Sequence, residues 1–123
     1  MGSICGIYNF DVKKIVDKKI LKKMSDKLKH RGADKEGYYL NGNIGFGYKQ
    51  FMVGYESREQ SISNENETIW IVLDGEIYNY VELREFLIKK GHKFSTKSDE
   101  EVIIHLYEDY EGDCLEFLRG MFV

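Results

Sequence analysis

The sequence lacks several features that would place it in a special class of protein. It has no proline, one tryptophan and two cysteines in 123 residues, and its formal net charge is only −3. No apolar run approaches the length that spans a bilayer, and no signal-peptide pattern precedes Cys5. A charge so close to neutral indicates that the chain as a whole is not built to bind nucleic acid. We therefore expect neither a membrane nor a nucleic-acid partner.

The few residues that could bind metal are scattered along the sequence. Cys5 and Cys114 lie far apart and lack Cys-x-x-Cys spacing, which favours neither a disulfide scaffold nor a zinc site. Glu101 and His105 lie four apart, but without further ligands this pair favours a surface ion pair. We expect Cys114 to be a core residue and the protein to be cytoplasmic, with no metal and no cofactor.

The composition is that of a folded domain. Hydrophobic residues make up 42% of the chain and aromatic residues 14%. A chain of this length forms one domain, residues 1–123, and no repeat, linker or low-complexity segment interrupts it.

The most informative stretch runs from a strand through a glycine turn into a helix. Ile69–Leu73 is apolar at every position, which predicts a strand covered on both faces. Gly75 follows, where a backbone amide can approach a substrate because no Cβ intervenes. Apolar residues at helical spacing between positions 83 and 87 predict a helix. Asn79 with Glu82 three residues later predicts a capping box at its start.

Other patterns predict helices packed over sheet. Ser98 with Glu101 predicts a second capped helix, ended by Gly112. The lysines of residues 17–29 favour a solvated helix face over a binding patch. The pattern as a whole predicts an α+β fold. The remaining predicted elements are strands at 4–10, 51–55 and 120–123, a helix at 17–29, an Asn41-Gly42 hairpin within 38–46, a surface loop at 56–67, and a helical turn at 114–118.

Five segments resemble one known family. Residues 74–80, Asp-Gly-Glu-Ile-Tyr-Asn-Tyr, resemble the Asn-Gly-Glu-Ile-Tyr-Asn signature of glutamine amidotransferases with an N-terminal cysteine nucleophile. The likeness is strongest to the glutaminase domain of asparagine synthetase. The other matching segments are Ile-Cys-Gly-Ile at 4–7, His-Arg-Gly-Ala-Asp at 30–34, Ser-Asp-Glu-Glu at 98–101 and Gly-Met-Phe at 120–122. Their shared order and spacing make the resemblance specific.

The resemblance implies a fold and partners as well as an activity. The family fold is the four-layer αββα sandwich of N-terminal-nucleophile hydrolases. The family domain is longer than this chain, so we expect the fold to be incomplete at its C-terminus. An open sheet edge would then pair with a missing segment or a second copy. A synthetase domain or subunit would receive the ammonia.

The resemblance also implies the roles of individual residues in glutamine hydrolysis. Cys5 would attack the side-chain amide of glutamine, with its own α-amino group as the general base. Asp74 and Gly75 occupy the oxyanion-hole positions. The expected glutamine-binding residues are Lys49, Gln50, Glu76 and Asp99, with Gln50 at the carboxylate and Asp99 at the amine.

Three departures from the family pattern leave a second hypothesis open. Met1-Gly2-Ser3-Ile4 precedes Cys5, Asp74 replaces an asparagine that donates a hydrogen bond, and Gln50 replaces an arginine. The chain is therefore either a glutaminase domain or a non-enzymatic or truncated descendant used for binding, regulation or assembly. On the second hypothesis Cys5 is a buried hydrophobe, residues 74–75 are a turn, and Asp99 is an acid favoured by a helix dipole.

Overall fold

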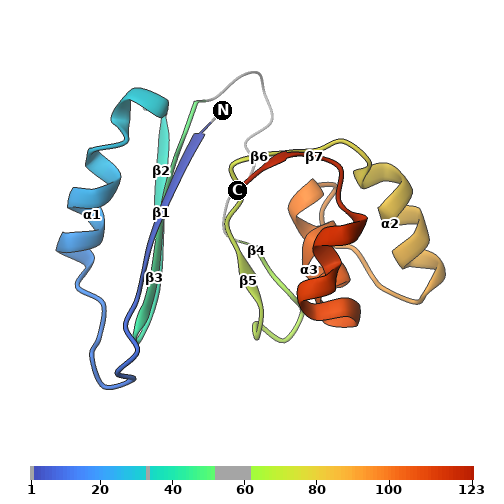
Figure 1. Ribbon diagram of the computed structural model, residues 1–123, viewed down its shortest axis with the longest axis horizontal. Helices are drawn as coiled ribbons and strands as arrows, with labels where there is room; N and C mark the ends of the chain where they lie inside the picture. The colour runs from blue at the N-terminus through green and yellow to red at the C-terminus, as the bar shows by residue number, and fades with distance from the viewer. Residues whose placement is uncertain (1, 33, 52–61) are drawn as a thin grey trace. The chain divides into compact units, whose positions relative to one another are not determined.

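The computed structural model describes residues 2–32, 34–51 and 62–123 (Figure 1). The chain divides into two compact units, Met1–Ser61 and Ile62–Val123. Both units combine helices with antiparallel strands, as the sequence predicts. No helix in the described part of the chain has the length and apolar character needed to cross a membrane.

The first unit is a three-stranded antiparallel sheet in the order β1-β3-β2, with α1 against one face (Figure 1). Its elements are β1 (Gly2–Tyr8), α1 (Lys18–Asp26), the 3₁₀ helix η1 (Lys29–Arg31), β2 (Lys35–Asn41) and β3 (Ile44–Gln50). The predicted hairpin is confirmed, although its strands are longer than expected. Gly42 has φ of 58°, as the first position of a type II′ turn requires.

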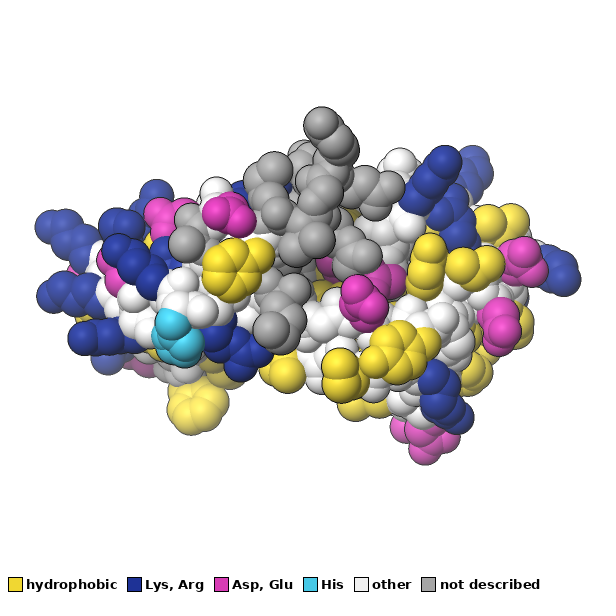
Figure 2. Space-filling model, turned by 90° about the horizontal axis from the view of Figure 1, so that it is seen from above, with side chains coloured by type: hydrophobic (Ala, Val, Ile, Leu, Met, Phe, Trp, Pro, Cys, Tyr) yellow, Lys and Arg dark blue, Asp and Glu magenta, His cyan; other side chains and the backbone are white. Residues whose placement is uncertain are grey.

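Helix α1 packs on the sheet through a narrow apolar face. The Asp17 carboxylate accepts the N–H of Lys19 at 2.8 Å and caps the helix. Leu21 is fully buried, and it approaches the β3 backbone at Gly45, where a Cβ would collide with the side chain of Val16. Figure 2 shows Lys and Arg side chains gathered at this end of the chain, in agreement with the predicted solvated lysine face. Ile20, expected on the apolar face, is exposed.

The second unit combines two small antiparallel sheets with helices (Figure 1). One sheet pairs β4 with β5 and the other pairs β6 with β7. Its elements are β4 (Ile62–Ser63), β5 (Trp70–Ile71), β6 (Gly75–Ile77), α2 (Tyr80–Lys89), α3 (Asp99–Tyr110), the 3₁₀ helix η2 (Glu111–Phe117) and β7 (Gly120–Phe122).

A single apolar cluster holds the second unit together. It joins β6, α2, α3 and η2 through eight buried residues. The predicted core role of Cys114 is confirmed, since only 3% of it is exposed. The cluster consists of Leu73, Ile77, Leu83, Leu87, Val102, Leu106, Cys114 and Leu118.

The strand predicted at Ile69–Leu73 is shorter and less covered than expected. Only Trp70 and Ile71 form ladder pairs, with β4, and both are half-buried. The reason is that β4, which pairs with it, has only two residues and lies inside the segment predicted as a loop. Asn64 closes this hairpin, because its Oδ1 accepts the N–H groups of Thr68 and Ile69.

Neither predicted capping box forms. Asn79 makes no side-chain cap bond; its amide instead donates to Phe117 O at 2.9 Å and accepts the N–H of Arg119 at 3.0 Å. Tertiary contacts with the segment before β7 therefore replace the local cap. Ser98 also makes no cap bond, although α3 begins directly after it, because Glu101 reaches back to Ser95 and Thr96.

Of the strand predicted at 51–55, Phe51 lies outside β3 and the rest lies outside the described residues.

Candidate functional site

The predicted site residues are divided between the two units. Cys5, Lys49 and Gln50 belong to the first unit. The second unit carries Asp74 and Gly75 with Glu76 and Asp99.

Cys5 lies in the middle of β1, opposite Gly47 of β3. A Cβ at Gly47 would sit only 3.0 Å from Cys5 Sγ, so glycine leaves the room that the thiol occupies. Burial raises the pKa of the Cys5 thiol, while a backbone hydrogen bond from Gly47 and the charge of Lys49 act in the opposite direction. The thiol is therefore mostly protonated near neutral pH, and a nucleophilic role requires a base.

The residues before Cys5 are part of the sheet. Gly2, Ser3 and Ile4 pair with Gln50, Lys49 and Tyr48 in that order. Ser3 is buried, with 5% of its surface exposed. The strand therefore begins earlier than the predicted start at Ile4, and the backbone nitrogen of Cys5 is an amide within a strand.

Lys49 is a buried cation held by two carboxylates. Its Nζ contacts the Glu36 carboxylate and lies 3.5 Å from Oδ1 of Asp26 in α1. The hydrogen bond to Glu36 raises the pKa of Lys49, and the same bond lowers the pKa of Glu36. The Lys49 ammonium is thus neutralised inside the first unit.

Cys5 and Gln50 lie on opposite faces of the sheet. Cys5 is opposite Gly47, and side chains alternate along β3, so Cys5 shares a face with Lys49 and not with Gln50. The Cys5 face is the one that α1 covers, since Lys49 contacts Asp26. The backbone around Gln50 is tightly packed: its carbonyl accepts the N–H of Asp34 at 3.2 Å.

In the second unit, the Gly75 N–H points away from β7. The carbonyl of Asp74 accepts the N–H of Val123 at 2.9 Å, so this carbonyl points toward β7. All the described peptide bonds are trans, and in a trans peptide the N–H is directed opposite to the carbonyl. The Gly75 N–H is therefore presented at the other edge of β6, as a hydrogen-bond donor to a substrate would need to be.

Glycine is also required at position 75 for packing. Its φ of 135° is rarely adopted by other residues, and a Cβ would sit 2.0 Å from the Met121 carbonyl oxygen. Of the predicted turn at residues 74–75, Gly75 is the first residue of β6. Glu76, the next residue, is exposed and pairs with Met121.

Asp99 bonds to the backbone at the same edge of β6. It is 4% exposed, and its Oδ2 accepts the Ile77 N–H at 3.0 Å. Ile77 lies two residues after Gly75, so the two N–H groups face the same side of the strand. The structure thus brings Asp99 and the Gly75 amide to one edge; both were expected in the glutamine site, whereas the hydrogen bond from Ile77 was not predicted.

Sequence reasoning also missed a polar cluster around α3. Glu101 and His105, expected as a surface pair, are both buried, at 4% and 2% exposure. The signal that could have revealed the cluster is the recurrence of His and acidic residues at positions 101, 105 and 108, all on one helix face, together with His92.

A comparison with solved structures establishes the class of fold. The chain is similar to the glutamine phosphoribosylpyrophosphate (PRPP) amidotransferase from B. subtilis, solved in complex with ADP and GMP. The TM-score is 0.71 at 21% identity, covering 99% of this chain and 34% of that one. The predicted α+β fold of the N-terminal-nucleophile type is confirmed.

The sequence comparison establishes the family. The profile described as "Glutamine amidotransferase domain" matches residues 1–123, so the chain belongs to this family. It is 43% identical over 104 residues to asparagine synthetase [glutamine-hydrolyzing] 1 of Bacillus subtilis (strain 168), covering 84% of this chain. It is 44% identical over 100 residues to the protein of the same name from Arabidopsis thaliana, covering 80% of the chain.

The chain corresponds to a small part of each of these relatives. It spans 16% of the Bacillus protein and 17% of the Arabidopsis protein. It also spans 20% of a putative asparagine synthetase [glutamine-hydrolyzing] 1 of Methanocaldococcus jannaschii, at 42% identity over 113 residues.

Proposed function

We propose that this domain hydrolyses the side-chain amide of glutamine to glutamate and ammonia. The observation that carries the proposal is the match of residues 1–123 to the glutamine amidotransferase domain, together with relatives whose names include glutamine hydrolysis. The cysteine, glycine and aspartate at positions 5, 75 and 99, which match positions of the motifs that the chain resembles, support it.

Cys5 is the proposed nucleophile, and cleavage after Ile4 is the proposed activating step. An α-amino group has a pKa of about 7.7–8.0, so part of it is neutral near pH 7 and accepts the thiol proton, which an amide nitrogen cannot do. The thiolate attacks the amide carbon, the carbon–nitrogen bond breaks, and the proton leaves with ammonia. Water then cleaves the thioester, giving glutamate and the free thiol.

The second unit carries the residues assigned to the oxyanion and to the amine of the substrate. We assign the Gly75 N–H to the developing oxyanion, because it points away from β7. Asp74 flanks it, at the motif position where the family has an asparagine donor; a carboxylate there only accepts hydrogen bonds, so Gly75 would be the principal donor. Asp99 would bind the substrate amine, since its carboxylate lies at the same edge of β6. Glu76, the residue after Gly75, would support these two residues.

The carboxylate of glutamine would be bound from the first unit. Gln50 occupies the motif position for this role, and its amide donates a hydrogen bond without charge. Lys49 contributes positive charge from the same strand, although Glu36 and Asp26 already balance it. We therefore expect weaker glutamine binding than an arginine at position 50 would give.

Two observations favour a second function, assembly or regulation without catalysis. Residues 2–4 are paired strand residues ahead of Cys5, and Cys5 and Gln50 occupy opposite sheet faces. A domain that retains this arrangement would keep the fold and not the reaction. Relatives named as glutamine-hydrolysing enzymes support the first function over the second.

The proposed partners follow from the relatives. A synthetase domain or subunit would use the ammonia for asparagine synthesis, as the names of the relatives indicate. Edge strands β1 and β2 of the three-stranded sheet are candidate surfaces for a second copy. Both cysteines are free, which supports the cytoplasm as the compartment.

The test compares glutamate release by two versions of the chain, one beginning at Met1 and one beginning at Cys5. We expect release from the version with the free Cys5 amine and its loss in Cys5→Ala. Cys114→Ala is the matched control, because it removes the other thiol and should retain activity if the chain stays folded. Glutamate release that is absent from both versions, each shown to be folded by circular dichroism, would support the non-catalytic function instead.

A further inference from the structure

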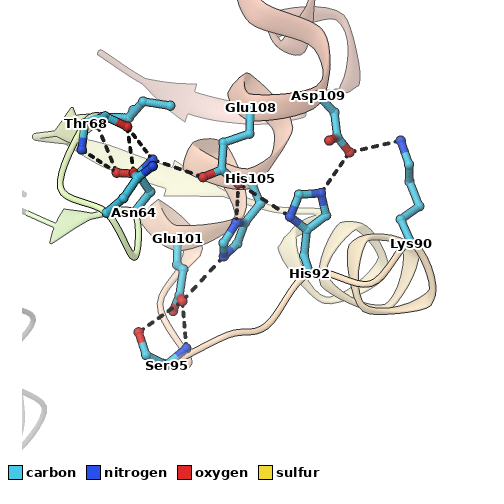
Figure 3. Close-up of polar contacts among 11 residues, drawn as sticks. Asn64, Thr68, Lys90, His92, Ser95, Glu101, His105, Glu108 and Asp109 are labelled. Atoms are coloured by element: carbon cyan, nitrogen blue, oxygen red, sulfur yellow. Dashed lines mark hydrogen bonds and ion pairs between the residues drawn. The ribbon is translucent and has the colours of Figure 1, made fainter.

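Three side chains of the second unit converge on one point, although none belongs to the glutaminase motifs. His105 Nδ1 lies 2.9 Å from Glu108 Oε2, and His92 Nδ1 lies 3.5 Å from the same oxygen. The three potential ligand atoms all lie within 4.8 Å of one another. Figure 3 shows dashed lines from the Glu108 carboxylate to both histidine rings.

The other nitrogen of each ring faces a second carboxylate. His92 Nε2 is 2.9 Å from Asp109 Oδ2, and His105 Nε2 is 3.6 Å from Glu101 Oε1 (Figure 3). A neutral imidazole donates through one nitrogen and accepts through the other. Asp109 accepts the proton at Nε2 of His92, which directs the Nδ1 lone pair of His92 into the space beside Glu108. In His105 the hydrogen bond runs between Nδ1 and Glu108, and Glu101 stands near Nε2, where the ring proton would lie once Nδ1 binds an ion. Histidine ligands of metal ions are commonly oriented by carboxylates in this way.

The acids that orient the rings are themselves fixed. Glu101 accepts the backbone N–H groups of Ser95 at 2.7 Å and Thr96 at 2.6 Å. Asp109 contacts Lys90 Nζ at 2.9 Å. Both acids therefore have partners of their own, and they act as outer supports rather than ligands.

Glu108 is also anchored, through its second oxygen. Asn64 donates to Glu108 Oε1 at 3.1 Å, which leaves Oε2 directed at the two histidines. The side chain is partly exposed, so water can reach the cluster. His105 is buried, and His92 lies in the segment between α2 and α3, outside either helix.

We propose that His92, His105 and Glu108 form a binding site for a divalent transition metal of the zinc type. Two imidazole nitrogens and one carboxylate oxygen are a ligand set that Zn²⁺ accepts, with water in the remaining position. The ion takes the place of the proton between His105 Nδ1 and Glu108, and protons compete with the ion for these ligands, so binding weakens as pH falls. The bound ion would link the segment after α2, through His92, to the last turns of α3. This proposal differs from the expectation from sequence that the chain binds no metal.

The experiment titrates Zn²⁺ and, separately, Co²⁺ into the whole chain after treatment with a chelator. Calorimetry should give about one equivalent of Zn²⁺ per chain, and Tm should rise on addition of the metal. The visible spectrum of the Co²⁺ form reports the ligands. Bands from nitrogen and oxygen ligands support the site, whereas a thiolate charge-transfer band would place the ion at a cysteine and overturn it.

Matched variants separate this site from other donors. His92→Gln should weaken Zn²⁺ binding by at least about 10-fold, and Glu108→Gln, which keeps the oxygen bonded to Asn64, should do the same. The third histidine of the chain, at position 30, belongs to the first unit, so His30→Gln should bind as the parent does. Circular dichroism checks the fold of each variant. A parent that binds no metal, or equal binding by His92→Gln and the parent, would show the cluster to be an ion-pair network only.

Discussion

The Ile77 N–H donates to the Asp99 carboxylate at 3.0 Å, and this bond connects β6 to the first turn of α3. Ile77 is almost completely buried, so its amide has no access to solvent water. The same edge of β6 carries the Gly75 N–H. The position of the proposed oxyanion donor therefore depends on an aspartate that is distant in sequence.

Replacing Asp99 by alanine should destabilise the chain by about 1–3 kcal/mol, because it leaves the buried Ile77 N–H without an acceptor. Asp99→Asn retains an oxygen that can accept this hydrogen bond and should cost less. Urea unfolding followed by circular dichroism gives both values. Equal losses in the two variants would contradict the assigned hydrogen bond.

Replacing Gly75 by alanine should destabilise the β6–β7 pair by roughly 1–3 kcal/mol or more. The added Cβ would meet the Met121 carbonyl, and φ at this position is 135°. The control is Gly112→Ala, where nothing lies within 4 Å of the added Cβ. Thermal unfolding should show a lower Tm for the first variant and almost no change for the second. A Tm for Gly75→Ala equal to that of the parent would rule out the close approach.

The Glu36–Lys49 ion pair should give stability that depends on pH. The bond to Lys49 lowers the pKa of Glu36 in the folded chain, so its contribution is complete above the unfolded value of about 4.3. It is lost as pH falls through the lower folded value. Glu36→Gln should therefore be less stable than the parent at pH 7, and the difference should shrink below about pH 4.

Urea midpoints at a series of pH values test this dependence. The exposed Glu65 gives a control variant, Glu65→Gln, in the second unit. A difference between the parent and Glu36→Gln that stays constant down to acid pH would exclude the ion pair as its source.

Replacing Asp74 by asparagine should raise kcat for glutamine hydrolysis in the version that begins at Cys5. An asparagine amide donates to an oxyanion, whereas an ionised carboxylate only accepts, and one such donor is worth about 10²- to 10³-fold in kcat. The control is Asp113→Asn in η2, which should leave kcat unchanged. Steady-state glutamate release measures both. An unchanged or lower kcat in Asp74→Asn would show that position 74 does not face the oxyanion.

Local patterns in the sequence were sufficient for most of the fold. The helix at 17–29, the hairpin around Gly42 and the strand at 120–122 form because apolar spacing and turn residues act over a few neighbours. The strand predicted at Ile69–Leu73 was only partly confirmed, because its pairing partner β4 lies in a segment whose polar composition predicted a loop. Short strands of this kind depend on tertiary pairing more than on propensity.

The polar contacts were harder to predict, since they join residues far apart in the chain. Asn79 has the sequence context of a cap, but its amide is used 38 and 40 residues away, at Phe117 and Arg119. Asp99 lies in the first turn of a helix, where an acid is favoured by the helix dipole, yet its carboxylate accepts a hydrogen bond from the Ile77 N–H. In both cases a distant backbone group offered a better partner than the nearest one.

The most direct test of the account is to locate the covalent bond between the protein and its substrate. The version beginning at Cys5 is incubated with an electrophilic glutamine analogue, digested, and mapped by mass spectrometry. We predict that the analogue is attached to Cys5, that glutamine in excess prevents the attachment, and that Cys114 stays unmodified. Attachment to Cys114, or attachment to Cys5 that glutamine does not suppress, would contradict the proposed glutaminase site.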